Sequence, residues 1–238
     1  MRERGFNLIE LLIVLVIVGI VMSIAVPNLQ SQIVSARTRG VAESIQSGLL
    51  LARSEAIRRN ALMRFQLVST MDATCAASAT SRLWVVTQFT GVTSPANTRG
   101  EPWARCNIKP YSPPDHEEPC PTTPAYTVDT ASNPPTAASC TADPFIAYQS
   151  STETAASVDV SATPSSVGSL AGLVVTFGPL GQLAANYDGT TMQAATTATI
   201  SVGPSSGVEG RRYRVQVNAN GTVRFCNPDL DSSNAMAC

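Results

Sequence analysis

The sequence has little of the chemistry that enzymes and metal sites use. It contains one histidine, His116, and one lysine, Lys109, and only 5% of its 238 residues are aromatic. A single histidine cannot supply a multi-histidine metal site, and no nucleophile–base pair is evident beside it. A glycine-rich phosphate loop and a G-x-S-x-G sequence are both missing. We therefore expect no enzymatic activity, no metal and no cofactor, and a structural or binding function is favoured.

Charge is also scarce, and it is unevenly distributed. The charged residues make up 14% of the chain and the formal net charge is -1, so the whole molecule has no global attraction to nucleic acid or acidic lipid. Between Ser31 and Arg64 six arginines stand against two glutamates, and between Ile200 and Cys226 four arginines stand against one glutamate. Residues 65–199 carry ten acidic and four basic side chains. Any anion-binding surface must therefore be local.

The longest apolar run is at the N-terminus, over residues 6–26. About 20 such residues in a helix span the hydrocarbon core of a bilayer. Arg2 and Arg4 precede the run, and positive charge keeps a short N-terminus on the cytoplasmic side. No small-residue cleavage site follows it, unlike in an ordinary signal peptide. We expect a single-pass transmembrane helix in the inner membrane, with the rest of the chain in the periplasm.

One carboxylate, Glu10, interrupts this run. A charged side chain within a membrane segment costs about 2.5 kcal/mol or more near the helix centre, so its presence marks function. Cleavage between Gly5 and Phe6 would create an α-amine one helical turn from Glu10. That amine could neutralise Glu10 of its own chain or of a neighbouring chain in a packed bundle.

The segment from Gly5 to Leu12, GFNLIELL, resembles the class III signal of type IV prepilins and type II secretion pseudopilins. The resemblance implies that residues 1–5 are a leader, that a prepilin peptidase cuts after Gly5 and methylates the amine of Phe6, and that Glu10 guides assembly. It also implies that Pro27 kinks the long helix. The partners would be membrane lipid before assembly and other pilins in a filament afterwards. The chain would then reside in a pilus or pseudopilus.

A helical period continues beyond Pro27. Apolar side chains recur at three- to five-residue steps, which predicts an amphipathic helix over residues 27–60 whose stripe packs on a sheet. The stripe consists of Leu29, Ile33, Ala36, Val41, Ile45, Leu49, Ala52 and Ala56.

After the helix, apolar and polar side chains alternate with a period of two residues, which predicts a β-rich domain over residues 61–238. The expected strands are Leu62–Ser69, Leu83–Thr90, Leu170–Phe177, Gly181–Asn186, Thr196–Val202, Arg211–Val217 and Thr222–Cys226, with one short strand within 150–169. Residues 91–143 are rich in Pro, Ser and Thr and predict a long insertion with little regular structure. The fold class is therefore α+β, a long N-terminal helix packed on a β-rich C-terminal domain.

The last two expected strands form a hairpin, and the apolar pattern favours one of its two possible registers. A three-residue loop over 219–221 pairs Val217 with Val223 and Val215 with Phe225, which gathers apolar residues on one face. A two-residue turn would pair Val217 with an arginine instead. We prefer the first register, with Gly221 in the left-handed conformation. Its other face then carries Arg212, Arg214 and Arg224.

The globular half resembles the minor pseudopilins of the FimT/FimU/GspH branch. The resemblance rests on residues 177–181 (FGPLG) and 220–226 (NGTVRFC), the second of which departs from the usual G-R-x-R-x-C-like ending. It implies a minor pilin of a type IV pilus, involved in filament priming and biogenesis. Two alternatives stay open: a GspH-type pseudopilin of a type II secretion system, and a receptor pilin that binds DNA for natural transformation through Arg212, Arg214 and Arg224.

The six cysteines lie in polar sequence, which is typical of disulfides in an oxidising compartment. Cys226 and Cys238 would close the C-terminal tail. We expect Cys106 to pair with Cys120 and Cys75 with Cys140, although six cysteines permit 15 connectivities. A metal site of Cys106, His116 and Cys120 with Asp115 or Glu117 lacks paired C-x-x-C spacing and is less favoured.

Overall fold

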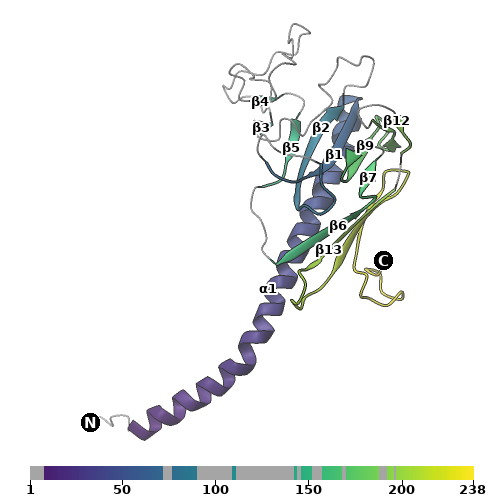
Figure 1. Ribbon diagram of the computed structural model, residues 1–238. Helices are drawn as coiled ribbons and strands as arrows, with labels where there is room; N and C mark the ends of the chain where they lie inside the picture. Colours follow the sequence, from purple (N-terminus) through teal and green to yellow (C-terminus); the bar gives the residue numbers. More distant parts are fainter. Residues whose placement is uncertain are drawn as a thin grey trace, which may run out of the picture.

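The computed structural model describes residues 8–71, 77–89, 109–110, 142–143, 146–151, 157–167, 170–187, 192–195 and 197–238. One long helix precedes a β-rich domain, which is the α+β arrangement expected from the sequence (Figure 1). The helix is α1 (Leu8–Arg59), and the strands are β1 (Leu62–Val68), β2 (Leu83–Phe89), β3 (Lys109–Pro110), β4 (Ala142–Asp143), β5 (Ile146–Gln149), β6 (Val158–Thr163), β7 (Ser166–Val167), β8 (Leu170–Ala171), β9 (Val174–Phe177), β10 (Leu183–Ala184), β11 (Asn186–Tyr187), β12 (Met192–Gln193), β13 (Ala198–Pro204), β14 (Tyr213–Val217) and β15 (Val223–Cys226).

Two antiparallel sheets form most of the domain. One has the strand order β10-β9-β1-β2-β5 and the other the order β15-β14-β13-β6. Three short pairs, β3 with β4, β7 with β8 and β11 with β12, lie outside these sheets. The C-terminal part of α1 contacts strands of both sheets, while its N-terminal part projects away from the domain (Figure 1).

The hydrophobic core lies between α1 and the inner faces of the two sheets. Its helix residues recur every three or four positions, as one buried face requires. They include Ala42, Ile45, Leu49, Ala52 and Ala56, and the sheets contribute Phe65, Phe177, Ile200 and Val215, among others. Gly48 lies on this face, where a Cβ would be 2.8 Å from ring atoms of both Phe65 and Trp84. The missing side chain at Gly48 therefore allows the helix to approach the sheet.

The predicted apolar stripe of α1 is wrong at its beginning. Leu29 and Ile33 are 59% and 44% exposed, and Ala36 is exposed as well. The buried positions in this stretch are Val34 and Thr38, whose hydroxyl donates to the carbonyl of Val34 at 2.9 Å. The sheets cover the helix only from Val34 onward, and sequence periodicity cannot locate where that cover begins.

The first part of α1 lies outside the domain. Its large apolar side chains from Leu8 to Met22 are between 42% and 81% exposed. Within the part of the chain that the structure describes, no helix has an apolar stretch long enough to cross a membrane. The helix runs without a break through position 27, and Figure 1 shows it curving along its projecting part. A kink caused by Pro27 stays a prediction.

The C-terminal hairpin has the register expected from its apolar pattern. Val217 pairs with Val223 and Val215 with Phe225, so the prediction is confirmed. Gly221 has a φ of 78°, in the left-handed region that glycine adopts without strain. A Cβ there would lie 1.8 Å from the carbonyl oxygen of Gly181, so this turn packs against the chain before β10.

Two predicted strands are interrupted. The expected strand Leu170–Phe177 consists of β8 and β9, separated at Gly172, which has a φ of 103°. A Cβ at Gly172 would lie 2.4 Å from the backbone nitrogen of Ser78, so the chain breaks where it presses on the segment after β1. The expected strand Gly181–Asn186 consists of β10 and the start of β11, which belong to different sheets.

The region around the insertion contains strands that the sequence did not predict. Most of residues 91–143 lie outside the described residues, but β3 and β4 form a short parallel pair within this range. β5, directly after it, pairs with β2 at the edge of the five-stranded sheet. Within residues 150–169, where one short strand was expected, the structure has β6, which forms the edge of the four-stranded sheet, and the two-residue β7.

Candidate functional site

Glu10 lies in the first turn of α1, in the projecting part of the helix. It is exposed, and its neighbours Ile9 and Leu11 are each 57% exposed. A carboxylate at this position is favoured by the positive end of the helix dipole. Gly5 and Phe6, the predicted sites of cleavage and methylation, lie outside the described residues. With a rise of about 1.5 Å per residue, an amine at position 6 of a continuous helix would lie about 6 Å from Glu10 along the axis.

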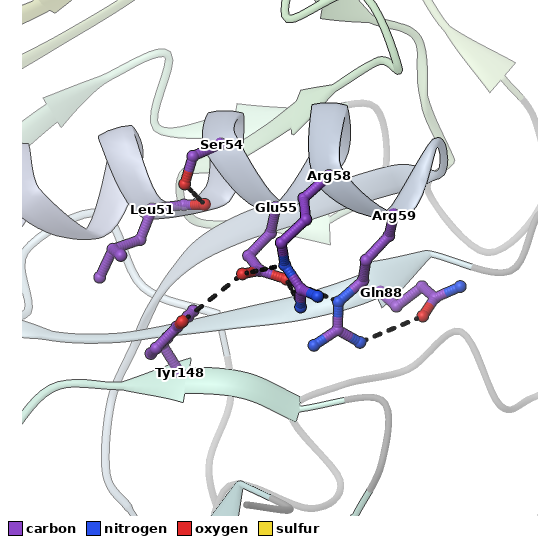
Figure 2. Close-up of polar contacts among 7 residues, drawn as sticks. All are labelled: Leu51, Ser54, Glu55, Arg58, Arg59, Gln88 and Tyr148. Carbon is purple, nitrogen blue, oxygen red and sulfur yellow. Dashed lines mark hydrogen bonds and ion pairs between the residues drawn. The ribbon is translucent and has the colours of Figure 1, made fainter.

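The other end of α1 carries a second carboxylate, which is buried. Glu55 is 5% exposed, and its Oε2 accepts from Nη2 of Arg58 at 2.6 Å and from Nε of Arg59 at 2.7 Å (Figure 2). The hydroxyl of Tyr148 in β5 lies 3.5 Å from its Oε1. The hydrogen bond from Arg58, above all, lowers the pKa of Glu55 despite its burial. This cluster joins the end of the helix to the strand that follows the insertion.

The three arginines predicted to share the outer face of the hairpin differ in their contacts. Nη2 of Arg212 lies 2.5 Å from Oδ1 of Asp229, and Nη2 of Arg224 donates to the carbonyl of Ala237 at 2.7 Å. Nε of Arg214 is buried and has no hydrogen-bond partner among the residues that the structure describes. Two of the three arginines thus contact the C-terminal tail, and whether the face binds DNA stays a hypothesis.

The tail is closed into a loop. A disulfide joins Cys226 to Cys238, with the two Cα atoms 5.1 Å apart, where the sequence places it. The backbone nitrogen of Asn227 donates to the carbonyl of Met236 at 2.7 Å, which draws the two ends of the loop together. The loop lies beside β15, and its first residues reach the arginine face.

The predicted pairings of the other four cysteines stay predictions. Cys75, Cys106, Cys120 and Cys140 lie outside the described residues, as do His116, Asp115 and Glu117. In the ranges that the structure describes, no three His, Cys, Asp or Glu side chains are grouped as metal ligands would be.

Two functional contacts were missed by sequence reasoning. Glu55 precedes Arg58 and Arg59 by three and four residues, a spacing that predicts side-chain pairs on one helix face. The sequence therefore carried a signal for these ion pairs, but it did not show that the carboxylate of Glu55 is buried. Asp229 gave no signal, because its contact with Arg212 depends on how the disulfide-closed tail folds back.

Two family descriptions match the chain. Residues 1–26 match the prokaryotic N-terminal methylation motif, and residues 41–221 match the family described as type II transport protein GspH. The chain belongs to the GspH family. This confirms the resemblance of residues 5–12 to a prepilin signal and the resemblance of the globular half to the GspH branch, and it identifies a minor pilin or pseudopilin with a prepilin-type N-terminus.

Solved structures of similar proteins are distant in sequence. They include the type IV minor pilin FimU of Pseudomonas aeruginosa strain PAO1, which is 12% identical over 82% of this chain and 90% of that chain, with a TM-score of 0.40. They also include the minor pseudopilin EpsH of the type 2 secretion system of Vibrio cholerae, which is 15% identical over 82% of this chain and 99% of that chain, also with a TM-score of 0.40. A comparison with curated protein sequences finds no match.

Proposed function

We propose that this GspH-family protein is a structural subunit of a type IV pilus or a type II secretion pseudopilus. Its N-terminal helix is held in the inner membrane after synthesis and is then packed among the helices of neighbouring subunits. The observation that carries the proposal is the projecting part of α1, where apolar side chains stand exposed around one carboxylate. Transfer of this surface from water or lipid into a helix bundle is the step that builds the filament.

Van der Waals packing of apolar side chains supplies the free energy of association, because lipid tails are as apolar as the helix and its transfer from the membrane removes little surface from water. It does not set the register, because a uniformly apolar helix can slide along its neighbours. A carboxylate does set it, since a charge in a low-dielectric bundle needs an opposite charge at one height. The methylated amine of Phe6, exposed when a prepilin peptidase removes residues 1–5, is the partner that we assign to Glu10.

Replacement of Glu10 tests this role. Glu10→Ala should leave the protein in the membrane fraction, because its apolar surface is intact, and should strongly reduce its amount in sheared filaments or the secretion that depends on it. Glu43→Ala is the matched control, because Glu43 is an exposed carboxylate on the same helix, paired with Arg39 at 2.7 Å outside the projecting part. Immunoblots of membrane and filament fractions give both quantities. Unchanged incorporation of Glu10→Ala would contradict the proposal.

A further inference from the structure

A groove lies on the outer face of the four-stranded sheet, on the side opposite the core, and its lining includes no residue of α1. Its volume is about 470 Å³, and it is lined by β6, β13, β14 and the first residues of the disulfide-closed tail, Pro228 and Asp229. Gly203 forms part of its floor, where a Cβ would lie 3.3 Å from Cγ of Arg212. The missing side chain at position 203 therefore leaves room for the stem of Arg212 beside the strand.

One row of side chains across this groove offers hydrogen-bond donors. Ser161 pairs with Ser201, and Ser201 pairs with Arg214, so the three side chains lie side by side on adjacent strands. Adjacent strands are about 4.8 Å apart, so the row extends about 10 Å. In the described part of the chain neither serine hydroxyl has a hydrogen-bond partner, and Nε of Arg214 is buried without one. A buried donor of this kind costs free energy until an acceptor reaches it.

The charged side chains of the neighbouring row already have partners within the chain. Arg212 is paired with Asp229, and Oδ1 of Asp159 accepts from the hydroxyl of Ser205 at 2.8 Å. Two arginines and two aspartates line the groove, so its formal charge is zero; beyond the Arg212–Asp229 pair, Arg214 is its free cation among the described residues and Asp159, on β6, keeps its negative charge. A nucleic-acid backbone binds through several uncompensated cations, and this groove leaves only Arg214 for that purpose. A single small acceptor group beside Arg214 therefore fits this groove better than a nucleic-acid backbone does.

We propose that this groove receives an acidic side chain, aspartate or glutamate, from a loop of another polypeptide. The carboxylate lies against the guanidinium of Arg214 and accepts from the hydroxyls of Ser161 and Ser201. A guanidinium presents a planar set of donors that matches a carboxylate, and such charge-assisted bonds are about twice as strong as neutral ones. That the polypeptide is a neighbouring filament subunit rests on the proposed function; the binding of the acidic side chain does not.

A peptide titration of the full chain in detergent micelles tests the groove. The probe is the capped tripeptide Ala-Glu-Ala, and the capped tripeptide Ala-Gln-Ala is its uncharged control. We expect the glutamate peptide to shift the backbone amide NMR signals of Ser161, Ser201 and Arg214 in a saturable way, and the glutamine peptide to leave them unchanged.

Two variants locate the binding on the groove. Arg214→Gln should weaken binding of the glutamate peptide about tenfold, as expected for loss of a hydrogen bond between charged groups. Arg211→Gln removes the same charge from an exposed position next to β14 and outside the groove lining, and it should bind within about twofold of the wild type. Gly203→Ala keeps every charge and narrows the hollow, so it should weaken binding while the thermal unfolding midpoint shows that the fold is kept.

Three results would overturn the proposal. The first is no saturable shift with the glutamate peptide. The second is equal weakening by Arg211→Gln and Arg214→Gln, which would indicate only long-range attraction. The third is an Arg214-dependent shift of the same amides by a DNA duplex but not by the peptide, which would assign the groove to nucleic acid. Because the titration needs no filament, its failure is distinguishable from a failure of the Glu10 assembly test.

Discussion

Glu55 shows how a charge is retained inside this fold. The carboxylate is almost fully buried, but Arg58 and Arg59 follow it by three and four residues on the same helix and both reach its Oε2. A buried carboxylate without partners would be strongly destabilising, whereas one with two guanidinium donors is tolerated. Tyr148 adds a contact from β5, so the end of α1 and the strand after the insertion depend on the same side chain.

Replacement of Glu55 should therefore destabilise the protein in a pH-dependent way. Because the pKa of Glu55 in the folded protein is lowered below its ordinary value of about 4.3, its contribution is fully present above that value and is lost as pH falls through the folded pKa. We expect Glu55→Gln to lower the free energy of unfolding at pH 7 by about 1–2 kcal/mol, since Arg58 is largely exposed and its bond is screened by solvent.

Urea unfolding followed by near-UV circular dichroism measures this difference. It should shrink as the pH is lowered from about 5 to about 3, because the wild type then loses the same interaction. Glu43→Gln is the control: its pair with Arg39 is exposed on both sides, and we expect a change below about 0.5 kcal/mol. A difference between Glu55→Gln and wild type that stayed constant with pH would show that the lost interaction is not ionic.

At the scale of single residues, the sequence is most informative where one residue differs in polarity from its neighbours. Glu10 stands out because it interrupts an apolar run. The contact between Arg212 and Asp229 does not stand out, since it joins residues 17 apart through a tail whose course depends on the disulfide. Strand alternation places Arg214 on the correct face. That its Nε has no hydrogen-bond partner among the described residues becomes clear only from the structure, where the neighbouring strands are in place.

Among the secondary-structure elements, α1 has two surfaces with different roles. Its C-terminal part is one wall of the core, whereas the apolar side chains described in its N-terminal part, from Leu8 to Met22, are exposed. Its glycines differ accordingly. Gly48 faces the rings of Phe65 and Trp84, whereas a Cβ at Gly40 would meet nothing within 4 Å.

A matched pair of substitutions tests how closely the helix approaches the sheet. Gly48→Ala should destabilise the protein by about 1–3 kcal/mol, because the added methyl group overpacks the core against two rings. Gly40→Ala should stabilise it by about 0.5–1 kcal/mol, because alanine loses less backbone entropy in a helix. Thermal unfolding of both variants under the same conditions gives the comparison. Stabilisation by both substitutions would mean that the helix and sheet are further apart than the structure shows.

The strands show why register is easier to predict than continuity. The alternating valines before and after the loop at 219–221 allow one register that buries them together, and the structure has it. The break at Gly172 had no such signal, because it arises where the chain meets Ser78 on another segment. Likewise, the burial of Val34 and Thr38 in place of Leu29 and Ile33 depends on where the sheets end along α1.

The whole molecule joins a β-rich domain to a helix that extends beyond it (Figure 1). The domain buries a continuous core of its own, but the projecting helix has no partner within the described chain for its apolar side chains. Such a surface is covered by lipid or by other helices. Membership of the GspH family and the N-terminal methylation motif agree with a subunit that first occupies a membrane and then a filament.

The proposed assembly depends most on the creation of a new amine opposite Glu10. Mass spectrometry of the chain purified from cells with an active prepilin peptidase measures this directly. We predict a protein that lacks residues 1–5 and begins with an N-methylated Phe6. A purified chain that still carried Met1 to Gly5 in such cells would leave Glu10 without its counter-ion and would contradict the proposed route into the filament.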